Sequence, residues 1–267
     1  MTTLDKAACR GQKPSMLLTA DSLRAPHGFF TRQGGVSCGP YASLNCSLSG
    51  QDERRSVLEN RARAARALGV APGSLVGLMQ VHGCEAVTVA KPWRPGEGPA
   101  GDAMVTDRPG IGLGIVTADC APVLFADEGA GVIGAAHAGW RGAVAGVLEA
   151  TVEAMISLGA SIQRIAAAIG PCIGQVSYEV GPELRDSVLA DNLAGAAFLR
   201  PGQRGARWQF DLSGYCRWRL ETTGVTRIDT IAADTVAEED RFFSHRRRTL
   251  TGGGPIGHQM SIVALAA

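Results

Sequence analysis

The sequence predicts an α+β fold, a single-domain sandwich of mixed β-sheets with flanking helices. Short runs rich in Val and Ile crowd the middle of the chain, and stretches of helical spacing lie on either side. In a doubly wound α/β fold strands and helices alternate strictly, whereas the strand and helix patterns of this sequence do not. No linker or repeat interrupts the 267 residues, so we expect one domain over 27–267 after a leader strand and loop over 1–26.

The elements follow from spacing and from turn residues. A glycine-rich stretch over 28–45 forms either a functional loop or the tight turn of a hairpin. An amphipathic helix is expected over 53–68, with Asp52 as its N-cap. Hairpins are expected to turn at Gly83 and at 127–129. Strands are predicted over 74–83, 84–90, 102–107, 110–120, 121–127, 131–140, 162–171, 227–234 and 260–266, and further helices over 142–159, 182–190 and 212–224.

Charge and cysteine content exclude several classes of protein. Lys and Arg number 26 against 25 Asp and Glu, so no net field would attract nucleic acid or an anionic membrane, and a small substrate fits better. The opening residues lack a secretory signal, and the final apolar stretch is too short to span a bilayer. Seven scattered cysteines without a Cys-x-x-Cys pair predict a reducing, cytoplasmic location.

Three residues with metal-binding side chains stand at predicted strand ends. His82 closes the run QVH, Cys120 closes TADC, and His137 stands in AAHAGW shortly before a glycine. Zinc prefers imidazole nitrogen and thiolate sulfur, and three protein ligands leave a fourth position for water or substrate. The three residues therefore predict a catalytic zinc site, with Asp119 beside it to accept a proton or to orient a ligand.

The spacing of these residues leaves two other interpretations open. Separations of 38 and 17 residues match no short metal motif, and a single strand-end His or Cys is commonly structural. Alternatively, Cys120 is a nucleophile and His137 is its base. His82 distinguishes the two chemical interpretations, because a Cys-His hydrolase needs one imidazole beside the sulfur and the zinc site uses two.

Arginine side chains predict an anion subsite. Arg141 opens a predicted helix directly after AAHAGW, where N–H groups and the helix dipole favour an anion, although the glycines there also suit a simple tight turn. Arg61 lies beside the apolar stripe of the first helix and can point inward or outward. Tyr178 is a polar group suited to a pocket wall. Arg247 follows a phenylalanine pair, which is typical of base stacking with phosphate binding or of an exposed basic loop.

Eight motifs then occur in one order: TRQGGVSCGPYASLN, ENRARA, QVHG, DAMVTD, TADCAPVL, AAHAGWRG, AAIGPCIGQVSYEVG and RFFSHRRR. From about Gly28 to the C-terminus the set resembles the YfiH-type laccase-domain family, described as purine nucleoside phosphorylases. The resemblance implies a fold of the CNF/YfiH-like cysteine-hydrolase type, and metal ligands at His82, Cys120 and His137. The candidate substrate or phosphate ligands in these motifs are Arg32, Asn45, Arg61, Arg141, Tyr178 and Arg247.

The resemblance also implies activities. They are phosphorolysis of adenosine, inosine, guanosine and methylthioadenosine, with a nucleoside and phosphate as partners, and hydrolytic deamination of adenosine. One branch of the family is described as a peptidoglycan-editing factor. A cytosolic amidase that removes a wrongly added amino acid from a cell-wall precursor is therefore an alternative, and a noncatalytic nucleotide- or metal-binding protein is a third.

The chain departs from the family pattern near its C-terminus. Where the family commonly has FSYRR and a later Gly-Arg-Gln, this chain has His245 in FSHRRR and His258 between Gly257 and Gln259. Base or phosphate contacts there are expected to differ. The older description of the family as multicopper oxidases does not fit, because five histidines without a His-x-His pair cannot ligate a four-copper array. We expect zinc, with copper binding to the same ligands in vitro.

Overall fold

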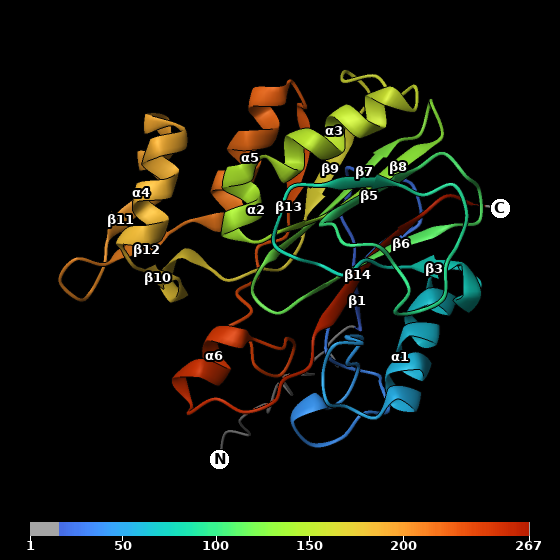
Figure 1. Ribbon diagram of the computed structural model, residues 1–267, viewed down its shortest axis with the longest axis horizontal. Coiled ribbons are helices and arrows are strands. Elements are labelled where there is room, and N and C mark those ends of the chain that lie inside the picture. Colours follow the sequence, from blue (N-terminus) through green and yellow to red (C-terminus); the bar gives the residue numbers. More distant parts are fainter. Residues whose placement is uncertain (1–15, 267) are drawn as a thin grey trace, which may run out of the picture.

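The computed structural model describes residues 16–266, so the leader predicted over 1–26 lies outside the described residues as far as residue 15. Two sheets lie face to face between helices (Figure 1). Helices α3 (Val147–Ser157) and α5 (Leu212–Thr223) cover the outer face of one sheet, and α1 (Arg54–Ala67) covers the outer face of the other. The predicted α+β sandwich with flanking helices is confirmed.

A six-stranded mixed sheet carries the middle of the chain, in the order β13-β9-β7-β8-β5-β4. β7 and β8 pair antiparallel, which confirms the hairpin predicted at 127–129. Every residue of β5, β7 and β8 is buried, because helices cover one face of the sheet and the second sheet covers the other. The strands are β4 (Ala86–Thr88), β5 (Ala103–Thr106), β7 (Ala121–Asp127), β8 (Val132–Ala138), β9 (Ala166–Ile169) and β13 (Arg227–Thr230).

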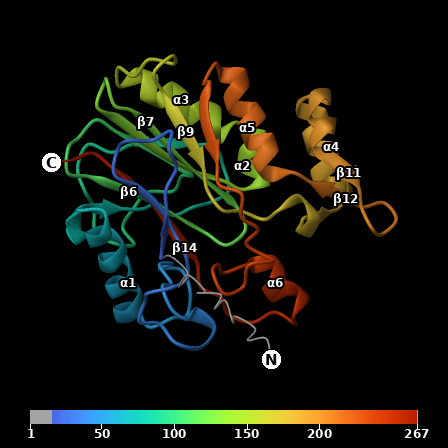
Figure 2. The same cartoon turned by 180° about the vertical axis from the view of Figure 1, so that it is seen from behind.

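The second sheet has five strands in the order β1-β2-β14-β6-β3. The C-terminal strand β14 lies between β2 and β6, so segments from both ends of the chain meet in this sheet. The view from behind again places α1 and α3 on opposite sides of the paired sheets (Figure 2). The strands are β1 (Leu17–Leu18), β2 (His27–Phe30), β3 (Leu75–Val76), β6 (Gly112–Thr117) and β14 (Gln259–Ala264).

Smaller elements stand beside the sandwich. A three-stranded sheet in the order β10-β12-β11 projects to one side together with α4 (Figure 1). No described helix is both long enough and apolar enough to cross a membrane. These elements are β10 (Glu179–Val180), β11 (Leu199–Pro201), β12 (Trp208–Phe210), α2 (Trp140–Ala145), α4 (Pro182–Asp191), α6 (His245–Leu250) and the 3-10 helices Gly39–Tyr41, Pro72–Ser74, Gln175–Ser177 and Leu193–Phe198.

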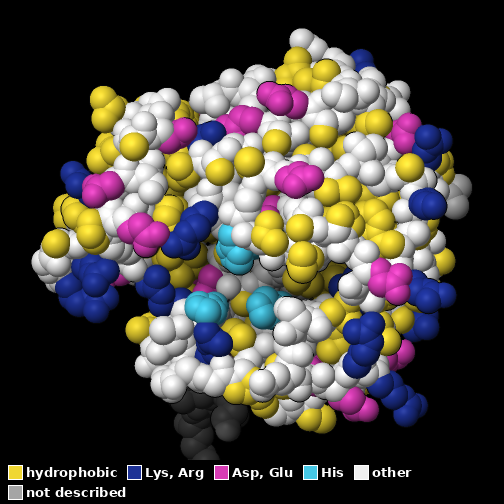
Figure 3. All heavy atoms as spheres, viewed as in Figure 1, with side chains coloured by type: hydrophobic (Ala, Val, Ile, Leu, Met, Phe, Trp, Pro, Cys, Tyr) yellow, Lys and Arg dark blue, Asp and Glu magenta, His cyan; other side chains and the backbone are white. Residues whose placement is uncertain are grey.

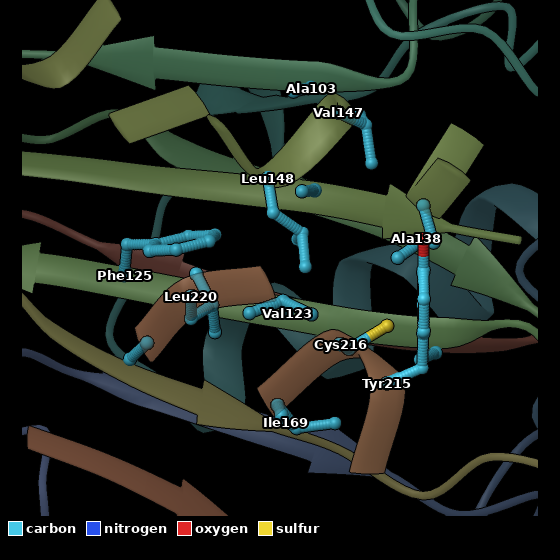
Figure 4. Close-up of a cluster of buried hydrophobic side chains, with 14 of the residues drawn as sticks. Ala103, Val123, Phe125, Ala138, Val147, Leu148, Ile169, Tyr215, Cys216 and Leu220 are labelled. Carbon is cyan, nitrogen blue, oxygen red and sulfur yellow. The ribbon is translucent and has the colours of Figure 1, made fainter. Parts of the chain in front are cut away.

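Hydrophobic cores occupy both faces of the six-stranded sheet. Alternate residues of β7 point to opposite faces, so Val123 and Phe125 pack under the helices while Leu124 packs against the five-stranded sheet. Figure 4 shows the first core, where Leu148 and Leu220 from the helices meet residues of the sheet. Each such buried side chain stabilises the fold by about 1.5–3 kcal/mol. The strand ends that carry the candidate ligands therefore rest on a rigid base.

The hairpin predicted at Gly83 is wrong. β3 pairs with β6 in the five-stranded sheet, whereas β4 pairs with β5 in the six-stranded sheet. The chain therefore crosses from one sheet to the other over residues 77–85. N–H groups of the 81–83 turn donate to the Asp102 carboxylate, which replaces the ladder bonds that a hairpin would have made.

The helix predicted over 142–159 is broken. Gly146 adopts a left-handed conformation with φ of 96°, which glycine adopts without steric cost, and it separates α2 from α3. α2 is therefore only six residues long, too short for the extended helix dipole on which the anion site at Arg141 was based.

Helix α1 begins and ends within one residue of the prediction, but its expected N-cap is wrong. Glu53 occupies the cap position, and its side chain makes no capping hydrogen bond. The Asp52 carboxylate instead accepts hydrogen bonds from Ser37 Oγ at 2.6 Å and Asn45 Nδ2 at 2.9 Å. Asp52 thereby ties the glycine-rich stretch to the start of the helix.

Candidate metal centre

His82, Cys120 and His137 come together where the β7–β8 pair meets the 81–83 turn. Cys120 precedes β7, whose residue Pro122 pairs with His137 near the end of β8, so antiparallel register makes the two side chains neighbours. One ligand atom from each of the three residues lies within 4.8 Å of the other two. The imidazole centroids are 4.7 Å apart and the rings are nearly perpendicular. Within residues 16–266 no other group of three His, Cys, Asp or Glu side chains is so arranged.

The buried Asp102 positions two of these residues. Its carboxylate lies 2.7 Å from Nδ1 of His137 and accepts the backbone N–H groups of Val81, His82 and Gly83 at 2.7–3.1 Å. With Nδ1 of His137 engaged, Nε2 is the nitrogen left for a metal. Our sequence analysis missed Asp102, because an aspartate after a glycine at the start of a strand resembles an ordinary turn residue.

Electrostatic coupling makes Cys120 a thiolate. Burial alone raises the pKa of the thiol, but His137 and His82 beside it outweigh burial and lower the pKa to about 6. Burial likewise lowers the pKa of His137, but Cys120 and Asp102 raise it to about 9. The metal-free centre therefore holds a thiolate–imidazolium pair at neutral pH, and the thiolate is the form of cysteine that binds metals.

Two glycines of AAHAGWRG leave space for this centre. A Cβ atom at Gly139 would lie 3.1 Å from Cys120 Sγ and 3.1 Å from His82 Cδ2. A Cβ atom at Gly142 would lie 2.7 Å from the carbonyl oxygen of Gly83. The glycines thus let α2 approach both the ligands and the turn that carries His82.

The candidate ligands line a cleft of about 450 Å³. Figure 3 shows histidine side chains gathered round a hollow on this face of the molecule. Trp140 and Tyr178 provide aromatic surface in its wall, and His245 and His258 line it as well. The cleft is therefore apolar in part, with imidazoles from three separate regions of the chain.

His245 and His258, the two histidines expected to differ from the family pattern, are neutral at physiological pH. Burial, together with the nearby His245, lowers the pKa of His258 to about 4. Burial and the Arg248 charge also lower the pKa of His245. The backbone N–H of His258 donates to Asn45 Oδ1 at 2.9 Å, while its Nδ1 is buried without a hydrogen-bond partner among residues 16–266.

Asp119 also lines the cleft, but both of its carboxylate oxygens are engaged. Oδ1 accepts the Thr235 hydroxyl at 2.6 Å, and Oδ2 accepts the backbone N–H of Arg246 at 2.5 Å. Its φ of 93° is unusual for a residue other than glycine. Asp119 thus ties α6 to the segment that carries Cys120.

Three of the six candidate substrate ligands line neither the cleft nor the cavity beside it, and they bond within the fold. Arg247 donates to the carbonyls of Thr235, Val236 and Phe242 at 2.7–3.0 Å. Arg32 donates to the carbonyl oxygen of Ala42 and stacks on Phe243. Asn45 donates to Asp52, and its side-chain oxygen accepts the N–H groups of Ser47 and His258.

The other three candidates face hollows. Tyr178 lines the cleft, where burial raises the pKa of its hydroxyl. Arg141 lies at the rim, stacked on Trp140, and donates to Glu183 Oε1 at 2.6 Å. Arg61 lines an adjoining cavity.

The chain resembles known proteins over nearly its whole length. The family model described as multi-copper polyphenol oxidoreductase laccase matches residues 26–266. A Deinococcus radiodurans protein named purine nucleoside phosphorylase is 44% identical over 93% of this chain and 92% of its own length. The Escherichia coli purine nucleoside phosphorylase YfiH is 40% identical over 83% of this chain and 88% of its own.

Solved structures agree with the fold. A Neisseria meningitidis protein superposes with a TM-score of 0.84 at 33% identity, covering 95% of this chain and all of that one. YlmD from Geobacillus stearothermophilus gives 0.83 at 30% identity, covering 96% and 98%. The chain therefore belongs to the YfiH-type laccase-domain family, as its ordered motifs predict.

Proposed function

We propose that the protein is a zinc-dependent purine nucleoside phosphorylase that acts on adenosine, inosine, guanosine and methylthioadenosine and also deaminates adenosine. The observation that carries the proposal is the group of His82, Cys120 and His137 at the base of an open cleft. Relatives at 40–44% identity that are named purine nucleoside phosphorylases support the substrate class.

The donor set fits zinc. Two imidazoles and one thiolate are ligands of the kind that zinc takes in catalytic sites with one open position. When bound, zinc supplies a Lewis acid and an acidified water molecule. Asp102 holds His137 as a carboxylate commonly holds a zinc-bound histidine. Copper prefers similar donors, so we expect it to bind the same residues in vitro without laccase chemistry. The histidine at position 27 supplies no copper ligand here, since its ring bonds to the backbone at residues 20 and 25.

The cleft wall suits a purine nucleoside. Trp140 and Tyr178 offer apolar faces for the base, and the neutral imidazoles of His245 and His258 offer hydrogen-bonding atoms without a charge. Asp119 is the one carboxylate among the described residues that line the cleft, and both of its oxygens are already engaged. The wall therefore presents no free carboxylate and suits the uncharged purine edge and the ribose hydroxyls.

The test is a product analysis. Zinc-loaded protein is incubated with adenosine, with and without phosphate, and inosine, adenine and hypoxanthine are separated by chromatography. We expect adenine only with phosphate, and inosine in both reactions. If no product exceeds the level of a Cys120→Ala control, the proposal fails.

A second candidate is an amidase, and one observation favours it. Cys120, His137 and Asp102 are linked in the order of a thiolate, its base and an orienting carboxylate, an arrangement that attacks carbonyl carbon without a metal. Release of serine from a mis-aminoacylated cell-wall precursor, without turnover of adenosine, would favour this candidate. His82→Ala separates the two, because a metal-free hydrolase retains activity without the second imidazole.

We also infer a cytoplasmic location. The six described cysteines, among them the exposed Cys38 and Cys84, are all free, as a reducing compartment requires. Fractionation of cells that express a tagged protein tests this, and recovery outside the cytoplasm would contradict it.

A further inference from the structure

Arg61 is a buried arginine without a carboxylate partner. It lies on α1 and is only 7% exposed. Its Nη1 donates to the carbonyl of Cys46 at 3.2 Å, and no Asp or Glu among residues 16–266 forms an ion pair with it. By contrast Arg63, two residues further on, pairs with Glu59 at the surface. Burying a guanidinium is costly unless an anion compensates its charge, so a compensating ligand is expected.

The guanidinium of Arg61 faces a cavity of about 270 Å³, here called the Arg61 hollow. A Cβ atom at Gly77 would lie 3.3 Å from Arg61 Nη2, so glycine leaves that side of the guanidinium open. The hydroxyls of Ser47 and Ser49 stand in the wall, 3.0 Å apart. Among residues 16–266 no acidic side chain lines the hollow, which therefore presents a positive charge and hydroxyl donors, as an oxyanion requires.

The Arg61 hollow adjoins the cleft of the metal centre. Ser47, Ser49, Gln80 and Val116 line both spaces. Gln80 is held rigidly between them, because its amide exchanges two hydrogen bonds with the backbone of Val116 at 2.8 and 2.9 Å. A ligand in the hollow and another in the cleft would thus contact the same wall residues. One of these, Gln80, stands two residues before His82 in the sequence.

We propose that the Arg61 hollow is the phosphate subsite of the phosphorylase, with the Arg61 guanidinium and the Ser47 and Ser49 hydroxyls binding inorganic phosphate beside a nucleoside in the cleft. The assignment rests on the proposed function. Arg141 and Arg247 are weaker candidates for binding phosphate. Arg141 already pairs with Glu183, and Arg247 already donates to three backbone carbonyls.

The reaction balances with phosphate as the only co-reactant. An oxygen of hydrogen phosphate forms a bond to the anomeric carbon of the ribose as the bond from that carbon to the purine nitrogen breaks. The electron pair of the broken bond leaves with the base. The proton of hydrogen phosphate ends on the base, so the products are ribose 1-phosphate and the neutral purine.

The test compares Arg61→Met with Arg63→Met. Methionine keeps the length and apolar stem of the side chain, which favours folding, and loses its charge. We expect the KM for phosphate to rise about 30- to 100-fold in Arg61→Met, as for loss of hydrogen bonds to a charged group. The Arg63→Met control should keep the wild-type KM for phosphate, and both variants should keep the zinc content of wild type.

Direct binding separates this proposal from the proposed function. Equilibrium dialysis with radiolabelled phosphate measures binding to zinc-loaded wild type and Arg61→Met. Binding lost only in Arg61→Met supports the subsite even if no base is ever released, a result that rejects the phosphorylase alone. Equal binding by both proteins, or none by wild type, overturns the subsite.

A second pair of variants guards against misfolding of Arg61→Met. Ser49 is exposed at the mouth of the hollow, so its substitution spares the core. Ser49→Asp places a carboxylate near Arg61 and should weaken phosphate binding about tenfold or more, whereas the uncharged, similarly sized Ser49→Asn should change it far less. Equal effects of the two substitutions would overturn the subsite.

Discussion

The two walls of the cleft are built in different ways. The metal wall, formed by His82, Cys120 and His137, rests on adjacent strands and on one buried carboxylate that accepts bonds from a histidine and a turn. The opposite wall consists of Ser47, Ser49, His245 and His258, from segments about 200 residues apart in the sequence. Asn45 Oδ1 accepts the backbone N–H groups of Ser47 and His258 and so joins these segments, while Asp119 ties α6 to the segment that carries Cys120.

Under the proposed function, the metal wall carries the chemistry and the opposite wall recognises the substrate. Strand register and buried hydrogen bonds fix the metal wall, as a preorganised set of ligands requires. The opposite wall can change residue by residue without disturbing the sheet, and it holds His245 and His258, where the sequence is expected to differ from the family pattern. Substitutions in the metal wall should therefore abolish metal binding and turnover together, whereas those in the opposite wall should change only affinity for substrate.

The largest effect is expected for Cys120→Ala. Without the thiolate, zinc content should fall to background and turnover should fall about 1000-fold or more, equivalent to about 4 kcal/mol of transition-state stabilisation. Metal analysis and product chromatography on the same sample measure both. Cys84→Ala, at an exposed cysteine, is the matched control and should retain zinc and activity. Normal zinc content in Cys120→Ala would contradict the metal wall.

The pH dependence of zinc affinity tests the ion pair of the metal wall. Between the pKa of Cys120, about 6, and that of His137, about 9, the thiol has lost its proton and the imidazole has not. Zinc binding then releases one proton, so affinity should rise about tenfold per pH unit across this window and level off above it. Below the lower pKa two protons leave, and the slope should steepen. Chelator competition gives the zinc affinity. A zinc affinity that does not change with pH between the two pKa values would exclude the thiolate–imidazolium pair.

Asp102→Asn should weaken zinc binding at the metal wall without removing a ligand. The amide cannot accept all the bonds of the carboxylate and no longer stabilises a charged His137, so zinc affinity should fall about 10- to 100-fold. The upper pH limit of the profile should also move down, because Asp102 helps to raise the pKa of His137. Asp107→Asn, near the surface beside Arg108, is the control. An unchanged pH profile would show that Asp102 does not act through His137.

The smallest effect is expected in the opposite wall. His258→Ala should leave zinc content and kcat near wild type while raising the KM for nucleoside about 3- to 10-fold, as for loss of one neutral hydrogen bond. Steady-state kinetics with inosine and adenosine measure the split. A loss of zinc in this variant would mean that the two walls are not independent.

Much of the fold follows from local patterns. Helix α1 and the β7–β8 hairpin arise from spacing and turn residues that short windows of sequence contain. The hairpin at Gly83 was misjudged because pairing partners are not local. The strands on either side of that glycine join different sheets, and only the packed sandwich determines which strands meet.

The candidate site was likewise predictable only in part from the sequence. His82, Cys120 and His137 are candidates in the sequence because each stands where an apolar run ends, and the resemblance to the family motifs singles them out. Asp102 was not visible, since its role depends on three N–H groups that converge only when the 81–83 turn folds over it. The inward direction of Arg61 was equally open, because helical spacing placed it at the border of the apolar stripe.

The most direct test of the account measures metal content and reaction products on one batch of protein. We expect one zinc per chain, and conversion of inosine with phosphate to equal amounts of hypoxanthine and ribose 1-phosphate at a rate that falls in proportion when zinc is removed by chelation. Zinc-loaded protein that releases no hypoxanthine, or metal-free protein that releases it at the same rate, would contradict the account.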